Sequence, residues 1–189
     1  MPKKAADGGG SFLGTQGLVA LAEVNAVVLV QRVERLADFK SDKPEHKQYA
    51  PSTQIKTHIL VVSSKGGARD GEFWPDQNLI SAGWTLKVDD EHAENGEVVA
   101  GRAATYGANR PCLNAPSDPE WNAIGDFYRS RDLDPDNPAH DTKLFEILLA
   151  EHKDAQRATV REANAKLGGK GGETGGNAAA GGADDEPPW

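Results

Sequence analysis

The sequence has almost none of the residues that build disulfides and thiolate metal clusters. Its 189 residues include one cysteine, Cys112, and one methionine. A single cysteine excludes an internal disulfide and a thiolate zinc cluster. The five histidines are scattered without metal-ligand spacing. We therefore expect no bound metal and no cofactor.

Long apolar runs are also missing. No run approaches the ~20 residues that a membrane-spanning helix needs. The start of the chain, residues 1–7, is charged and leads into glycines, with no apolar segment typical of a signal peptide. We therefore expect a cytoplasmic protein that is not inserted in a membrane.

A basic excess is missing as well. The formal net charge is -8, which argues against a generic nucleic-acid binder. The charges are unevenly distributed, however. Residues 32–69 carry eight basic side chains against four acidic ones, whereas residues 70–101 carry eight acidic side chains and one basic. The two stretches predict opposite faces of one domain, although solvated charge that merely clusters in sequence would give the same pattern.

Catalytic patterns are not evident. The segment Ser63–Gly67 resembles a phosphate-binding loop only superficially, because the full spacing and a following helix are lacking. The acidic run Asp89–Glu91 could hold Mg²⁺ for a nuclease, but solvated carboxylates in a hairpin loop account for it better. No Ser/His/Asp or Cys/His set stands out. We expect that the protein is not an enzyme.

Alternating apolar residues predict several strands. A long, buried strand is expected over 24–33, because β-branched residues are dense there. Further strands are expected at 54–63, 83–88 and 97–106. Phe73-Trp74-Pro75 is interrupted by proline and is typical of a loop or strand edge. Four or five strands joined by polar loops predict a small barrel or sandwich.

Two helices are expected after the strands. Ser117 and Glu120 form a capping box and enclose a proline in the first helical turn. A longer helix, capped by Asp141, is expected to run to about Leu167, where glycines end it. The expected organisation is a flexible arm over 1–17, a β domain over 18–115, a helical extension over 116–167, and a disordered glycine-rich linker with an acidic tip over 168–189.

The end of the chain predicts a tethered ligand for other proteins. Residues 168–183 contain eight glycines and only Lys170 and Glu173 as charges. Such a flexible coil spans on the order of 20 Å. The tip suits a shallow apolar pocket ringed by Arg or Lys, because it joins three carboxylates to one indole. An acidic tail that only aids solubility has no reason to carry this tryptophan. The residues expected to bind partners are Asp184, Asp185, Glu186, Pro187, Pro188 and Trp189.

This tail resembles that of bacterial single-stranded DNA-binding proteins and their phage counterparts, in which an uncharged glycine-rich linker leads to an acidic tip with proline and a final aromatic residue. Residues 25–30 also resemble the opening strand of that family. The resemblance implies an OB-like five-stranded barrel. This chain departs from the family in its longer N-terminal arm, its helical extension and the net charge of -5 outside the tail.

If the chain binds single strands, basic side chains should follow the phosphates and aromatic rings should stack on the bases. Trp74 is the preferred stacking residue, since Pro75 makes it hard to bury, whereas the alternation around Trp84 favours core packing. The acidic tip is expected to compete with DNA for the same basic groove. The candidate nucleic-acid-binding residues are Arg32, Arg35, Lys40, Lys47, Lys56, Lys65, Arg69, Trp74, Trp84, Lys87, Arg102 and Tyr106.

The sequence therefore favours a phage or bacterial protein that coats single-stranded DNA during replication, recombination or repair and recruits partner proteins through its tip. Weak individual sites gain from multiplicity, which favours a homo-oligomer. The alternative is a phage structural or adaptor protein that acts through protein–protein contacts of its helices and tail, without nucleic acid.

Overall fold

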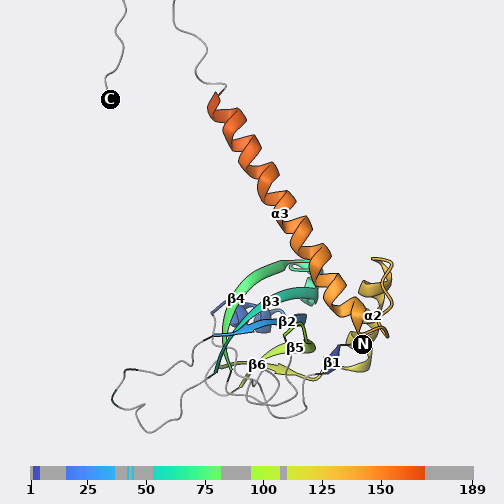
Figure 1. Cartoon of the computed structure of the whole chain (residues 1–189). Helices are drawn as coiled ribbons and strands as arrows, with labels where there is room; N and C mark the ends of the chain where they lie inside the picture. The colour runs from blue at the N-terminus through green and yellow to red at the C-terminus, as the bar shows by residue number, and fades with distance from the viewer. Residues whose placement is uncertain are drawn as a thin grey trace, which may run out of the picture. The chain divides into compact units, whose positions relative to one another are not determined.

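The computed structural model describes residues 2–4, 16–36, 42, 44, 53–81, 95–106 and 110–168. The chain divides into unit 1, Met1–His152, and unit 2, Lys153–Trp189. The elements in chain order are β1 (Lys3–Lys4), α1 (Gln16–Glu23), β2 (Val27–Arg35), β3 (Thr53–Ser63), the short 3₁₀ helix η2 (Lys65–Gly67), β4 (Phe73–Ser81), β5 (Val98–Tyr106), β6 (Arg110–Asn114), α2 (Asp118–Arg129) and α3 (Ala139–Gly168) (Figure 1).

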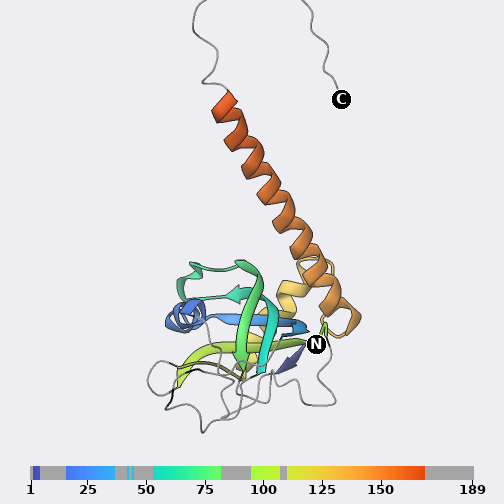
Figure 2. The same ribbon diagram turned by 60° about the vertical axis from the view of Figure 1, so that its left-hand side comes forward.

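Unit 1 is built on one mixed sheet of six strands. β2, β3 and β4 form an antiparallel meander, and β5 returns to pair with β2. The resulting order β5-β2-β3-β4 is that of a Greek key. β6 pairs antiparallel with β5, and β1 pairs parallel with β5. The sheet is strongly curved, and the strands cross one another at steep angles in Figure 2.

The described strands form a six-stranded sheet that does not close into a barrel, which corrects the expectation of a five-stranded barrel. Closure requires each strand to have two neighbours, and β4 pairs only with β3 within the described ranges. The coarser expectation is confirmed: the fold is mainly β with helices at its C-terminal end.

The sheet is buried on both faces because β2 is apolar on both sides. Val28 and Val30 enter one core, which is covered by Leu21 of α1. Leu29 enters a second core, on the opposite face of the sheet. A strand that is buried on both faces has a continuous apolar run rather than an alternating one. The dense valine run of β2 is therefore explained by two-sided packing.

The second core lies under α2 and the first turns of α3. Its fully buried side chains from these helices are Ile124, Tyr128, Leu144 and Phe145. The Tyr128 hydroxyl donates a 2.6 Å hydrogen bond to Asp141 Oδ1. Burial is the main reason why the pKa values of both groups are raised. This bond ties α2 to α3 inside the core.

Most of the expected elements are confirmed, with shifted boundaries. α2 begins as its capping box predicts, because Glu120 Oε2 accepts hydrogen bonds from the Ser117 backbone N at 2.7 Å and from its hydroxyl at 2.8 Å. α3 ends at Gly168, as expected, but begins at Ala139, so Asp141 lies in its first turn and is not its cap. Pro75 lies inside β4, a strand at the described edge of the sheet, where proline is tolerated.

Three elements were not expected from the sequence. β1 and the start of α1 fall within 1–17, the segment expected to be an arm, and β6 follows β5 after a short connection. The strand expected at 83–88 lies outside the described residues. The helices in the described ranges include none that is both long enough and apolar enough to span a bilayer.

Candidate nucleic-acid interface

The structure brings three of the candidate cations to one end of β2 and β3. In the register of these strands, Arg32 lies opposite Thr57 and Arg35 lies opposite Ile55. Lys56 stands between those two rungs and pairs with Glu34. We call Arg32, Arg35 and Lys56 the strand-end group. The antiparallel register brings distant parts of the chain to this end of the strands, with Lys56 on the opposite face of the sheet from Arg32 and Arg35.

Lys56 is held by two carboxylates. Its Nζ lies 3.3 Å from Asp76 Oδ1 and 3.6 Å from Glu34 Oε1. These contacts, the hydrogen bond to Asp76 first, raise the pKa of Lys56 above its ordinary value. Such exposed ion pairs contribute little stability, so a phosphate could replace either carboxylate at low cost.

Arg32 differs from its neighbours because it is only 8% exposed. Its backbone N donates to Glu97 O at 2.9 Å, and its carbonyl accepts from Gly96 N at 2.8 Å. Burial lowers the pKa of its guanidinium, Glu97 opposes that shift, and the nearby charge of Arg35 adds to it. Arg32 therefore lies within electrostatic range of both residues, with little surface left for a phosphate.

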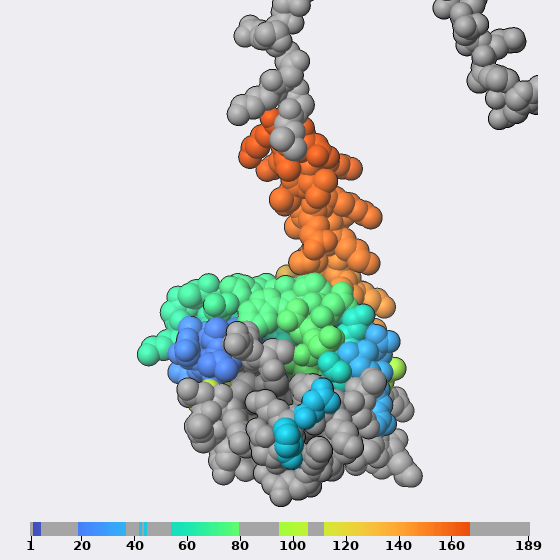
Figure 3. Space-filling view, turned by 90° about the vertical axis from the view of Figure 1, so that its left-hand side faces the viewer, coloured from blue at the N-terminus to red at the C-terminus, as the bar shows by residue number. Residues whose placement is uncertain are grey.

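A second group of candidates lies at the hairpin between β3 and β4. Glu72 Oε2 accepts from Arg69 Nη1 at 3.1 Å and from the indole Nε1 of Trp74 at 3.2 Å. Lys65 is exposed at the start of this hairpin, and its backbone N donates to Val24 O at 2.7 Å. We call Lys65, Arg69 and Trp74 the hairpin group. In Figure 3 the hairpin lies beside α1 on one face of unit 1.

Trp74 is half-buried, with its ring packed against the core that contains Leu21. The hydrogen bond from its indole to Glu72 holds the ring in place next to Arg69. A partly exposed tryptophan beside an arginine is a suitable surface for stacking a base. The stacking role of Trp74 stays a prediction.

The two groups lie at opposite ends of β3. Nine residues separate Lys56 from Lys65. At 3.2–3.4 Å per residue in a strand, this is roughly 30 Å. Arg102 belongs to neither group, because it lies on β5 and its Nη1 is 3.6 Å from Glu120 Oε1. The structure thus places the candidate cations of the β2–β3–β4 meander in two groups rather than in a single cluster.

The other candidates have no described side chain. Tyr106 ends β5, and only its backbone is described. The remaining ones lie outside the described residues: Lys40, Lys47, Trp84, Lys87 and the tip residues Asp184, Asp185, Glu186, Pro187, Pro188 and Trp189.

The acidic partners of these cations were missed by the sequence reasoning. Glu34, Glu72 and Asp76 each touch a candidate cation, and Asp76 also anchors a neighbouring histidine. The Asp76 backbone N donates to His58 Nδ1 at 3.0 Å, and burial lowers the pKa of His58. Asp76 has a φ of 54°, so it forms a bulge in β4. Of these contacts, only the Arg69–Glu72 pair could have been inferred from sequence spacing.

No family model, curated protein or solved structure matches the chain.

Proposed function

We propose that this chain binds single-stranded DNA along its β2–β3–β4 meander and recruits partner proteins through its acidic tip. The observation that carries the proposal is the placement of cations at both ends of β3, with the half-exposed Trp74 in the hairpin group. Basic side chains that follow a backbone, with an aromatic ring among them, suit a single strand of any sequence.

The strand arrangement supports this proposal. An OB fold is a partly open, five-stranded Greek-key barrel that binds nucleic acid on a strand face and on its loops. Here β2 to β5 form a Greek key, and β6 adds a fifth strand beside β5. The strand-end and hairpin groups lie on the meander of this Greek key. An OB-like architecture is therefore part of the proposal.

The ion pairs on the sheet limit the affinity that we expect. Lys56 and Arg69 each contact a carboxylate, so DNA must displace or neighbour these acids. If Arg35, Lys56, Lys65 and Arg69 each contact one phosphate, the logarithm of the binding constant should fall against the logarithm of the salt concentration with a slope of about -3. The affinity for DNA should thus be moderate and strongly salt-dependent.

The test is a fluorescence anisotropy titration of labelled oligo-dT with the full chain. Salt is varied from about 0.05 to 0.5 M. Binding at low salt is expected to quench tryptophan fluorescence. The pair Arg35→Gln with Lys56→Gln should weaken binding and make the salt slope shallower by about 1.4, and Lys65→Gln with Arg69→Gln should do the same.

A matched control separates site effects from net charge. Lys143→Gln with Lys166→Gln removes two exposed cations from α3, which is not part of the meander, and should leave the slope unchanged. Absence of any anisotropy change at low salt would refute the proposal. An equal loss of affinity for oligo-dT in the control variant would show that binding depends only on the overall charge of the protein.

One observation favours a second function. The candidate cations Lys56, Arg69 and Arg102 are already paired with acids of the same chain, as in a surface that does not need DNA to balance its charge. In that case the chain is an adaptor or phage structural protein that acts through its helices and tip. Oligo-dT would then fail to bind at any salt concentration.

A further inference from the structure

The part of α3 that belongs to unit 2 is exposed on every side. All of residues 153–166 are exposed. Val160, at 59% exposure, is the one large hydrophobic side chain that lies exposed in the described part of the chain. Helices in globular proteins are stabilised mainly by packing an apolar face, and this segment packs none within unit 2. The cationic side chains and Val160 of this segment are therefore accessible to a ligand.

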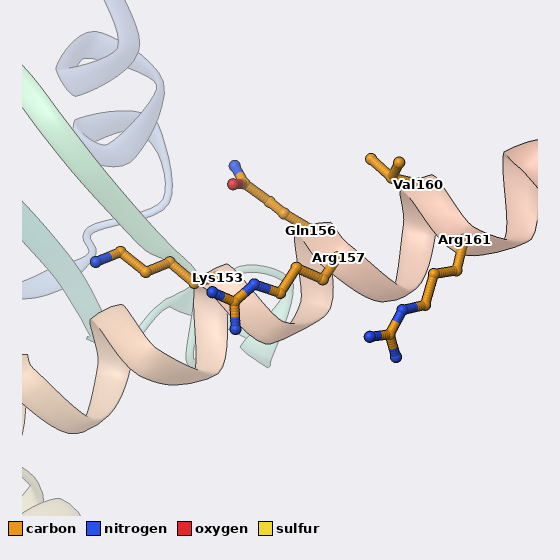
Figure 4. Close-up of a pocket in the computed structure, with 5 residues that line it drawn as sticks. All are labelled: Lys153, Gln156, Arg157, Val160 and Arg161. Atoms are coloured by element: carbon orange, nitrogen blue, oxygen red, sulfur yellow. The ribbon is translucent and has the colours of Figure 1, made fainter.

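One face of this segment is cationic, and Val160 flanks it on the side from which Gln156 also projects (Figure 4). Lys153, Arg157 and Arg161 follow one another at intervals of four residues, which places them on one side of the helix. These three, with Gln156 and Val160, line a shallow groove (Figure 4). Arg157 also contacts Asp154 at 3.2 Å, an exposed pair of the kind that is easily exchanged. We call these five lining residues the α3 groove.

We propose that the α3 groove binds the acidic tip of its own chain, residues 184–189. The charges are complementary, since three cations face a tip with three acidic side chains, Asp184, Asp185 and Glu186. Trp189 would cover Val160 and stack on a guanidinium, so that its indole ring leaves water for an apolar and cationic surface. Neither feature depends on DNA binding, so this inference stands apart from the proposed function.

The length of chain between the groove and the tip fits this docking. Lys153 lies fifteen residues and Arg161 seven residues before Gly168. At 1.5 Å per helical residue, these cations are about 23 and 11 Å from the end of the helix. The composition of 168–183 predicts a flexible coil with a root-mean-square span of about 20–24 Å. Effective concentration is highest when the linker span matches the distance, and it then reaches the millimolar range.

Docking within one chain would regulate how available the tip is. A partner protein must compete with a groove that is always near, so it needs a stronger basic pocket or a second contact. Salt should release the tip, because exposed charges are screened beyond ~10 Å at 0.1 M. The tip would thus be withheld from weak, nonspecific basic surfaces.

The test is ¹⁹F NMR of the full chain labelled with fluorotryptophan. The chain contains four tryptophans, so four resonances arise, and Trp189→Phe assigns one of them to Trp189. The Trp189 resonance should shift on Arg157→Gln with Arg161→Gln, on Val160→Ser, and when salt is raised to about 0.5 M. In the converse experiment, Asp184→Asn with Asp185→Asn should shift the Arg157 side-chain Nε resonance in the ¹H–¹⁵N spectrum.

Lys166→Gln is the matched control. It removes a cation from the same helix nine residues beyond Arg157, which is two and a half turns and therefore the opposite side. It should leave the Trp189 resonance in place. Circular dichroism verifies that each variant keeps its helix. A Trp189 resonance that ignores the groove variants would overturn the inference. A Trp189 resonance that shifts on Arg35→Gln with Lys56→Gln instead would also overturn it. So would a resonance that shifts on dilution, since docking within one chain is independent of concentration.

Discussion

Replacing Tyr128 with phenylalanine removes a single oxygen from the core between the sheet and the two C-terminal helices. The ring stays, and Tyr128 is fully buried, so the apolar packing of the side chain is preserved. Only the 2.6 Å hydrogen bond from the hydroxyl to Asp141 Oδ1 is lost. The variant therefore isolates the energy of one buried polar contact.

The expected loss of stability follows from the character of this bond. Asp141 is 9% exposed, and a hydrogen bond to a charged group contributes about 1.5–3 kcal/mol. We expect the free energy of unfolding to fall by about 2 kcal/mol. For a chain of this size, this corresponds to a decrease of about 4–8 °C in Tm. Urea denaturation, followed by far-UV circular dichroism and tryptophan fluorescence, measures the change.

The pH dependence of this loss provides a sharper test. Burial raises the pKa of Asp141, while the hydroxyl of Tyr128 lowers it, so the variant should have a still higher pKa at Asp141. A group whose pKa is raised on folding stabilises the folded state as the pH falls. Protonation of Asp141 therefore stabilises the folded variant more than the folded wild type. The difference in free energy of unfolding between the two should shrink toward about pH 4.

A double-mutant cycle with Asp141→Ala completes this experiment, because alanine leaves no acceptor for the Tyr128 hydroxyl. The coupling energy between the two positions is expected to be about 1–2 kcal/mol. If Tyr128→Phe lowers the free energy of unfolding by less than about 0.5 kcal/mol, or by the same amount at neutral and acid pH, the hydrogen bond does not hold α2 to α3 as argued.

Two further predictions concern stability. Burial lowers the pKa of His58 below its ordinary value, so the free energy of unfolding should fall as the pH drops below about 6.5. In His58→Gln, urea denaturation at about pH 7.5 and 5.5 should show a smaller fall, and a fall as large as that of the wild type would contradict this role. Ser117→Ala removes one hydrogen-bond donor to Glu120 at the start of α2 and should lower the free energy of unfolding by about 1 kcal/mol in the same assay. An unaltered urea midpoint would show that the capping box contributes nothing to stability.

Local sequence chemistry was a reliable guide where an element depends on its own residues. The capping box of Ser117 and Glu120 placed the start of α2, and the glycines after Leu167 placed the end of α3. The valines of β2 and the alternation in β3 placed the central strands of the sheet. These signals act over a few neighbouring residues, so they can be read without the fold.

Short elements whose stability comes from tertiary contacts could not be recognised. β1 is two residues long and exists only through its pairing with β5, and α1 is an eight-residue helix anchored by Leu21 in the core. β4 was not predicted as a strand because it contains Pro75. Proline is tolerated in an edge strand, and the sequence does not show that β4 is at the described edge of the sheet.

For the candidate site, the sequence alone determined which side chains are cationic, aromatic or acidic, and that the end of the chain combines carboxylates with an indole. Only the tertiary structure decided how they are grouped. The register of β2 and β3 pairs Lys56 with Glu34, and a bulge in β4 brings Asp76 to the same amine. The rest of β3, as far as Ser63, separates Lys56 from Lys65. The reason is physical: Coulomb interactions depend on distances through space, and these are set by hydrogen-bonded pairing between segments far apart in sequence.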